Sequence, residues 1–278
     1  MMRVDLIATA DGLVLEGNGE WRHGPQLGTI DDVFISEQPA ELAAAWFADG
    51  ATCVPPEDGA VLAPIGSQEV WAAGVTYLRS RVARVAESQQ AGGDAFYDLV
   101  YDADRPELFF KATPHRVVGP GGAVRIRGDS SWDVPEAELT LAVNRFGRVF
   151  GHTIGNDMSS RSIEGANPLY LPQAKVYAGC AALGPRLVID ALPPPHTAIR
   201  LAVDRRGDTV FAGATELAQI KRDLVELAGW LYRENEFPVG AYLMTGTGIV
   251  PGDDFTLEQG DQIRIEIDGI GTLVNVVA

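Results

Sequence analysis

The stretch WDVPEAELTLAVN, residues 132–144, decides the fold expected for this chain of 278 residues. Pro135 has no N–H to donate, so it can only begin a strand or lie on an edge. Side chains alternate between the two faces of a strand, so Glu136 and Glu138 project from the same face. Two carboxylates this close resist joint ionisation unless a proton or a cation lies between them. A solvated strand face would also carry such a pair, so the pair alone does not define a site.

A second carboxylate stretch, GHTIGNDMSSR at residues 151–161, follows a turn at Arg145-Phe-Gly147 that predicts two paired strands over 138–154. A hairpin returns the end of its second strand to the start of the first, so we expect Asp157 beside the two glutamates. Three carboxylates with room for water suit Mg²⁺, with Mn²⁺ or Ca²⁺ as alternatives. A zinc site is not expected, because no HxH or HExxH pattern joins the four scattered histidines: His23, His115, His152 and His196.

The remaining pattern predicts an α+β, β-rich fold with a small N-terminal α/β domain at residues 1–66 and a catalytic domain at 67–278. The Pro- and Gly-rich stretch 55–66 sets that boundary. Gly50 is expected to end a helix that begins at Ala40. Further strands are expected at 3–8, 12–15, 70–75 and 107–111, hairpins around 204–208 and within 262–277, and helices at 77–90, 94–102 and 216–234.

The composition excludes several classes of partner. A formal net charge of −16 and a pI near 4.6 make the chain a poor ligand for nucleic acid or for an anionic membrane surface. No apolar run approaches the roughly 18–20 residues that cross a bilayer, and the first residues lack the character of a targeting segment. Two cysteines, Cys53 and Cys180, make no disulfide framework. We therefore expect a soluble, cytoplasmic protein.

Four separated blocks give the chain a resemblance to a known family. From about Val70 to the C-terminus it resembles the fumarylacetoacetate hydrolase family. The resemblance implies a roll of mixed β-sheets with flanking helices, a small N-terminal domain, Mg²⁺ or Mn²⁺ held by Glu, Glu and Asp, and a homodimer or homotetramer. The blocks occur in the family's order: Glu136-x-Glu138, GNDMSSR at 155–161, Lys175 and TGTG at 245–248.

The resemblance also implies roles for single residues. The three hairpin carboxylates match the metal ligands. Lys175 matches a lysine that contacts the substrate or moves protons. Arg161 matches an arginine of the active-site wall, and Thr247 matches a threonine that helps to hold the substrate carboxylate.

The chain departs from the hydrolases of this family in the stretch GVTYLRSR, residues 74–81. It contains no histidine to activate water, and Ser80 stands near the expected position. The amino-acid sequence at 102–112, 130–139 and 164–180 more closely resembles the sugar-acid branch of this family, which acts on 2-oxo-3-deoxy pentonates without a water nucleophile. The resemblance therefore implies a dehydratase that converts a 2-dehydro-3-deoxy-pentonate of the D-arabinonate type to 2,5-dioxopentanoate.

Two glutamates join Lys175 as candidate acids or bases. Glu164 follows Asp157 by seven residues, two helical turns if Ser159 caps a helix there; the alternative is an exposed helix charge. Glu107 shares one strand face with Lys111, which would put an acid and a base in one pocket; the alternative is a salt-bridged edge strand.

Substrate contacts are also expected from Lys111, and from Arg79 and Ser80 at the substrate's polar end, unless these last two lie on the surface at the start of a helix. Two other reactions on the same scaffold remain open, hydrolysis of an acylpyruvate and decarboxylation of a 2-oxo diacid such as oxaloacetate. A catalytically idle sugar-acid-binding protein or scaffold is the alternative from another class.

Overall fold

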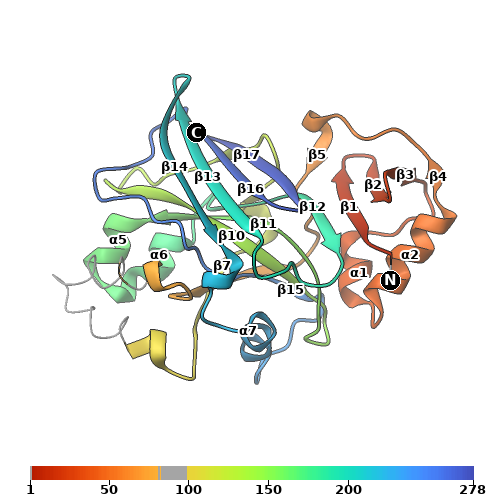
Figure 1. The fold of residues 1–278 in the computed structure, drawn as a ribbon, viewed down its shortest axis with the longest axis horizontal. Helices are drawn as coiled ribbons and strands as arrows, with labels where there is room; N and C mark the ends of the chain where they lie inside the picture. The colour runs from red at the N-terminus through yellow and green to blue at the C-terminus, as the bar shows by residue number, and fades with distance from the viewer. Residues whose placement is uncertain (1, 81, 83–98) are drawn as a thin grey trace.

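β-Strands dominate the computed structural model, which describes residues 2–80, 82 and 99–278 (Figure 1). The larger sheet has twelve strands. Ten of them run in the order β4 (Ala51–Thr52), β3 (Glu20–His23), β2 (Gly12–Gly17), β1 (Val4–Thr9), β12 (Ala181–Ile189), β11 (Val149–Ser160), β10 (Asp133–Val143), β15 (Ala241–Met244), β6 (Glu69–Gly74) and β7 (Glu107–Ala112). The other two are β5 (Val61–Leu62), which pairs with β1, and β8 (Val117–Val118), which pairs with β12.

A smaller sheet and several helices complete the described chain. The sheet has five strands in the order β14 (Asp208–Glu216), β13 (Ala198–Arg205), β16 (Gln262–Ile267), β17 (Gly271–Val277) and β9 (Ala123–Val124). The α-helices are α1 (Ile30–Ile35), α2 (Pro39–Asp49), α5 (Arg161–Ala166), α6 (Leu171–Lys175) and α7 (Leu224–Leu231). The β-rich α+β fold expected from the sequence is confirmed.

The hairpin β10–β11 forms the centre of the larger sheet. Its turn is the predicted one, with Gly147 at a φ of 76° that favours glycine. Pro135 lies two residues inside β10, where β11 pairs with it through Met158, whereas β15 pairs only with residues 140–143. The missing N–H of Pro135 therefore falls on a stretch of β10 that has one partner strand, which agrees with the expected edge position.

The two faces of this hairpin pack into different hydrophobic cores. One face contributes Leu139 and Ile154 to a core shared with the smaller sheet, for example with Ile265. The other core contains Phe34 of α1 and Tyr242 of β15, whose rings pack edge to face at 4.9 Å. The strands that carry the candidate site therefore lie between two hydrophobic cores.

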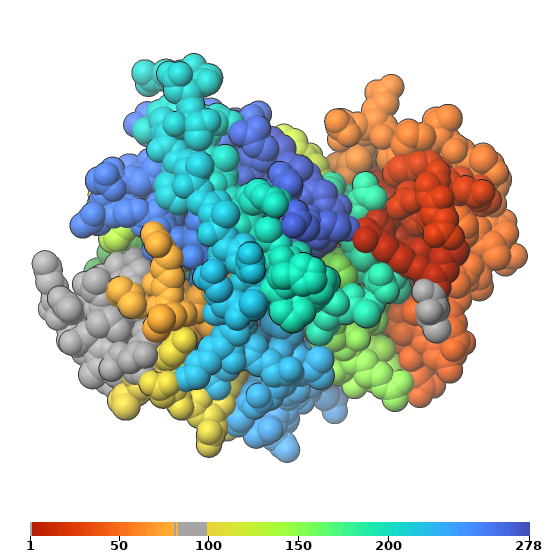
Figure 2. Space-filling view, viewed as in Figure 1, coloured from red at the N-terminus to blue at the C-terminus, as the bar shows by residue number. Residues whose placement is uncertain are grey.

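The N-terminal segment is joined to the rest of the molecule by backbone pairing. Figure 2 shows it as a lobe, in red and orange, at one side of the molecule. Its strand β1 pairs antiparallel with β12, Val4 opposite Ile189. The domain boundary at residue 66 remains a prediction. Among the described residues, no helix combines the length and apolarity needed to span a bilayer.

The predicted helix over 216–234 is wrong in its first half. A single 3₁₀ turn, Leu217–Gln219, is followed by an extended stretch, and α7 begins only at Leu224. Ile220 pairs with Tyr77 in an isolated bridge, and the N–H of Lys221 donates to the carbonyl of Thr76. These tertiary contacts override the helical spacing, and Asp223 caps the shorter helix.

The other predicted elements vary in how far they can be compared. Helix α2 ends at Gly50 as expected, and both C-terminal hairpins form at β13–β14 and β16–β17. The helix expected over 77–90 begins at residues 78–80, but most of it, like residues 94–98 of the next expected helix, lies outside the described residues.

His152 of β11 is a buried histidine that the fold keeps neutral. It is 4% exposed, and its Nδ1 has no hydrogen-bond partner among the described residues. Burial, together with the positive charge of Arg3, lowers the pKa of His152 to about 4. Between pH 6.5 and 4 the unfolded chain therefore binds a proton at this position that the folded chain does not.

This difference predicts a pH-dependent loss of stability. Above pH 6.5, His152 is neutral in both the folded and the unfolded chain and does not affect the free energy of unfolding. As the pH falls from 6.5 towards 4, protonation of the unfolded chain lowers the free energy of unfolding. From pH 7 to pH 5 it should remove about 2 kcal/mol from the free energy of unfolding. His152→Leu should lose this part of the pH dependence in denaturant titrations at the two pH values. His115→Leu, which replaces an exposed histidine, is the control. Equal pH slopes for wild type and His152→Leu would contradict the prediction.

Candidate metal and active site

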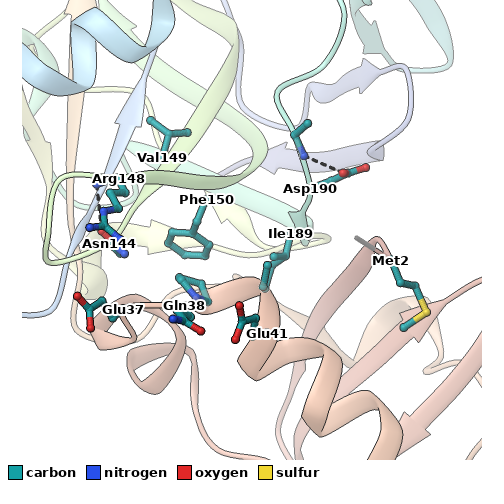
Figure 3. A pocket seen from close by; sticks show the side chains of 13 residues that line it. Met2, Glu37, Gln38, Glu41, Asn144, Arg148, Val149, Phe150, Ile189 and Asp190 are labelled. Carbon is teal, nitrogen blue, oxygen red and sulfur yellow. Dashed lines mark hydrogen bonds between the residues drawn. The ribbon is translucent and has the colours of Figure 1, made fainter.

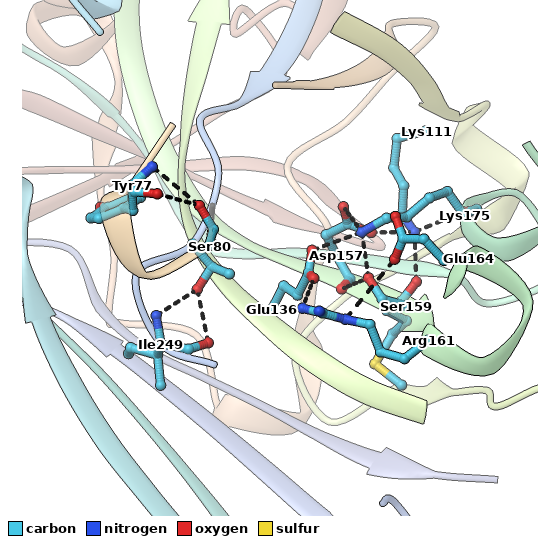
Figure 4. Close-up of polar contacts among 12 residues, drawn as sticks. Tyr77, Ser80, Lys111, Glu136, Asp157, Ser159, Arg161, Glu164, Lys175 and Ile249 are labelled. Atoms are coloured by element: carbon cyan, nitrogen blue, oxygen red, sulfur yellow. Dashed lines mark hydrogen bonds and ion pairs between the residues drawn. The ribbon is translucent and has the colours of Figure 1, made fainter. Parts of the chain in front are cut away.

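The register of the β10–β11 hairpin brings three carboxylates together. Asp157 lies directly opposite Glu136, and Glu138 lies opposite Gly155. All three are at most 4% exposed, and each offers an oxygen within 4.8 Å of the others' (Figure 4 shows Glu136 and Asp157). A Cβ at position 155 would lie 2.2 Å from Thr140 Oγ1, so glycine is needed for this close packing.

Three cationic side chains neutralise this carboxylate cluster. Lys175 Nζ lies 2.7 Å from Glu136 Oε2 and 3.0 Å from Asp157 Oδ2. Arg161 Nη2 lies 2.5 Å from Glu136 Oε1, and Lys111 Nζ lies 2.5 Å from Asp157 Oδ1. Charges this deeply buried are tolerated only when they are paired and hydrogen-bonded. The cluster is therefore built to hold charge away from water.

Glu138 is the carboxylate with the least cationic compensation. Burial raises the pKa of Glu138 well above its usual range, and the negative charges of Asp157 and Glu136 raise it further, while Lys175 acts in the opposite direction. Its Oε2 accepts a 2.6 Å hydrogen bond from the N–H of Gly246. A dication among the three carboxylates would relieve this repulsion, and an all-oxygen donor set is the kind that Mg²⁺ prefers. The residues present therefore fit a magnesium ion.

The opposite wall of the site comes from two loops, one after β6 and one after β15. Val75 adopts a φ of 54°, which is strained for a β-branched residue, and such strain is common at functional sites. Gly246 has a φ of 89°, and a Cβ there would lie 2.1 Å from Thr76 Oγ1. Thr76 in turn donates to the carbonyl of Thr245, which ties the two loops together.

A cavity of about 20 Å³ lies between these walls, enough for roughly one water-sized sphere. The cavity is lined by Ala73, Gly74, Val75, Ser80, Phe109, Glu136, Glu138, Asp157, Arg161, Lys175, Gly246 and Thr247.

Cavity size alone would have selected another place. A hollow of about 350 Å³ lies between the start of α2 and the β10–β11 turn (Figure 3), and one of about 640 Å³ lies beside Trp21 and Arg186. Among the described residues, however, only Glu136, Glu138 and Asp157 form a group able to hold a metal ion. Chemistry, and not volume, identifies the candidate site.

The structure brings most of the predicted site residues together. Ser80, Arg161, Lys175 and Thr247 line the cavity with the three carboxylates, and Ser80 accepts a hydrogen bond from the N–H of Tyr77.

The other four predicted residues are not part of the cavity lining. Glu107 packs against Gly74, where an added Cβ would lie 2.0 Å from its Oε2. Glu164 is 2% exposed, with its Oε2 4.0 Å from Arg161 Nε. Lys111 is fully buried and does not line the cavity, and Arg79 is exposed. The roles assigned to all four remain predictions.

Ser159 is a site residue that the sequence interpretation missed. The prediction that it caps a helix is wrong, because β11 continues to Ser160 and α5 begins at Arg161. Ser159 Oγ instead lies 2.5 Å from Lys175 Nζ. The available signal was its parity with Asp157, which puts both side chains on one face once the strand is known to continue.

Fold and site together define a metal-dependent enzyme in which a β-hairpin presents buried carboxylates to a divalent cation and a lysine. The comparison with known families agrees with this class. Residues 70–278 match the family described as fumarylacetoacetate (FAA) hydrolase C-terminal, and the chain belongs to that family. The resemblance seen in the sequence is confirmed.

Two similar proteins and one solved structure are named as sugar-acid dehydratases, one of them as a probable one. The chain is 49% identical over 216 residues to a probable 2-keto-3-deoxyxylonate dehydratase of Haloferax volcanii, covering 77% of this chain and 73% of the relative. It is 44% identical over 218 residues to 2-dehydro-3-deoxy-D-arabinonate dehydratase of Saccharolobus solfataricus, with the same coverage. A solved 2-keto-3-deoxy-D-arabinonate dehydratase, complexed with magnesium and 2,5-dioxopentanoate, is 32% identical with a TM-score of 0.82, covering 99% of this chain and 98% of the solved one.

The carboxylate cluster predicts how Glu138→Gln behaves. The change keeps the shape of the side chain and removes one negative charge from the metal site. We expect Mn²⁺ or Mg²⁺ affinity, measured by calorimetry, to fall about tenfold or more. The metal-free protein should be no less stable, because a buried charge repelled by two neighbours has been removed.

Glu266→Gln is the matched control, since Glu266 is half-exposed on β16 and its Oε1 lies 3.0 Å from Arg200. It should leave metal affinity unchanged. Wild-type affinity in Glu138→Gln would remove Glu138 from the set of ligands.

Proposed function

We propose that this chain is a Mg²⁺-dependent dehydratase that converts a 2-dehydro-3-deoxy-pentonate of the D-arabinonate type to 2,5-dioxopentanoate and water. One observation carries the proposal. The three-carboxylate hairpin belongs to a chain that matches, almost end to end, a solved dehydratase holding magnesium and 2,5-dioxopentanoate. We assign the metal to Glu136, Glu138 and Asp157.

The reaction requires a proton to leave C3, hydroxide to leave C4, and a further proton to move from C5. The water released combines the C3 proton with the C4 hydroxyl. A proton from C5 then moves to C3, and the enol formed in this way becomes the aldehyde when its hydroxyl proton moves to C4. A bound dication supplies Lewis acidity to the C2 carbonyl, which stabilises negative charge developing at C3. The protein must then supply the base, the acid and the binding contacts.

Lys175 is the best placed of the candidate bases. Its Nζ lies at the cavity, beside two of the proposed metal ligands. Glu107 and Glu164 are the candidates for the acid that assists the departure of hydroxide, because both lie next to cavity-lining residues.

The substrate is an anion, and the chain as a whole carries a charge of −16. The field therefore has to be inverted locally. Lys175, Arg161 and Lys111 provide this local positive charge, and we propose that Ser80, Thr247 and Arg79 contribute further substrate contacts. Lys111 and Arg79 lie outside the cavity lining, so their contact with substrate would require rearrangement.

The residues that line the cavity favour dehydration over hydrolysis as the reaction. Among the described residues that line it, none is a histidine, and Ser80 lies in the wall. Hydrolysis of an acylpyruvate needs a group that activates water, whereas dehydration does not. Decarboxylation of a 2-oxo diacid needs only the metal and the same stabilised charge, so oxaloacetate is the competing substrate.

The purified protein should turn over 2-dehydro-3-deoxy-D-arabinonate when Mg²⁺ is present. The product aldehyde can be followed with a coupled aldehyde dehydrogenase, and EDTA should abolish turnover until Mg²⁺ is restored. The epimer at C4 serves as the control for stereochemistry. Turnover of oxaloacetate by metal-loaded protein, with neither epimer converted, would replace dehydration by decarboxylation.

We also propose that the protein acts in the cytoplasm as a homodimer or homotetramer. The described chain contains two free cysteines, Cys53 and Cys180, which agrees with a reducing compartment. The chain has a mass of 29.7 kDa. Light scattering coupled to size-exclusion chromatography should therefore give two or four times this mass, and a value equal to the monomer would contradict the assembly.

A further inference from the structure

Lys175 is the proposed proton carrier, and its usefulness depends on where its long, flexible side chain places Nζ. In the described chain Nζ donates to three oxygens: Glu136 Oε2 at 2.7 Å, Asp157 Oδ2 at 3.0 Å and Ser159 Oγ at 2.5 Å. An ammonium group has three hydrogens, so this set satisfies it completely. The side chain is fully buried and cannot turn to water instead.

The three partners of Lys175 are not equivalent. Glu136 and Asp157 are carboxylates assigned to the metal, so their lone pairs are shared between the lysine and the cation. Ser159 is uncharged, and it lies outside the group of three carboxylates that we assign to the metal. It is therefore the one partner of Lys175 that is not assigned to the metal.

The Ser159 hydroxyl is itself held in one orientation. Ser159 is 0% exposed, and its O–H donates to the backbone carbonyl of Asp157 at 3.2 Å (Figure 4). With its hydrogen committed to this carbonyl, the oxygen presents a lone pair to Lys175 Nζ. Strand β11 fixes both ends of the arrangement, because Asp157 and Ser159 are two residues apart on one face.

We infer that Ser159 is a positioning residue that holds Lys175 Nζ at the cavity, where it can exchange a proton with C3 of the substrate. The inference rests on the proposed function only in naming that proton. Ser159 itself acts through Lys175, and has no role in binding the metal.

The adjacent Ser160 offers a matched control. It is also on β11, is also 0% exposed, and pairs with Asp133. Its side chain points to the opposite face of the strand from Ser159. Removing its hydroxyl changes the same number of atoms in the same strand without touching Lys175.

Ser159→Ala should lower kcat about tenfold or more while KM and Mn²⁺ affinity stay within about threefold of wild type, because an interaction that only places a proton carrier acts on the chemical step. Ser159→Thr, which restores the hydroxyl, should recover most of the rate. Ser160→Ala should behave as wild type. In a Lys175→Met background, Ser159→Ala should lower the residual rate no further, because both changes remove one functional unit.

A second readout keeps this test separate from the proposed dehydration. Exchange of the C3 protons of 2-oxobutanoate for deuterium, followed by NMR in metal-loaded protein, reports proton removal alone. Exchange without dehydration by the wild type would refute the proposed function and still test Ser159.

Three results would overturn the inference: an unchanged rate in Ser159→Ala, an equal loss in Ser160→Ala, or a rate loss accompanied by weaker Mn²⁺ binding. An additive loss in the Lys175→Met background would do so as well, whether or not Ser159→Thr folds. A wild-type protein that neither exchanges nor dehydrates overturns both proposals.

Discussion

The pairing register of β10 and β11 is the constraint on which the rest of the site depends. A shift of one residue would turn Glu136 and Glu138 to the hydrophobic core shared with the smaller sheet, away from Lys175 and Arg161. The register is held by the glycine turn at 147 and by the close approach of Gly155 to Thr140. Backbone hydrogen bonds, which carry no charge, thus determine where three carboxylates and three cationic side chains meet.

Charge compensation explains why such a cluster can be buried at all. Each of Glu136 and Asp157 has two cationic partners, whereas Glu138 has a backbone N–H from Gly246. The arrangement leaves one carboxylate whose charge is poorly balanced by the protein. A buried carboxylate with little cationic compensation is suited to bind a divalent cation, which is the role proposed for Glu138.

Much of the site could be predicted because it follows a short-range rule. Strand parity and a hairpin are enough to bring Glu136, Glu138 and Asp157 together, and the family blocks supply Lys175 and Arg161. The partners of Lys111 could not be predicted, because two of them are the backbone carbonyls of Met158 and Lys175, 47 and 64 residues away. The start of α7 was misplaced for the same reason, since the bridge between Ile220 and Tyr77 is absent from any local pattern. The prediction for Ser159 was wrong for a more local reason, because it misplaced the residue at which the strand ends and the helix begins.

The pairing of β1 with β12 in the larger sheet has a consequence for shortened forms of this chain. The family match begins at residue 70, yet β12 of the matched region is paired along residues 187–189 by β1, from the segment before it. A chain that began at residue 70 would leave the edge of β12 at residues 187–189 without the β1 pairing, and such an edge readily pairs with other chains and aggregates. The N-terminal segment thus protects a strand edge of the matched region from pairing with other chains. A shortened form of this protein would need another strand or segment on that edge to avoid aggregation.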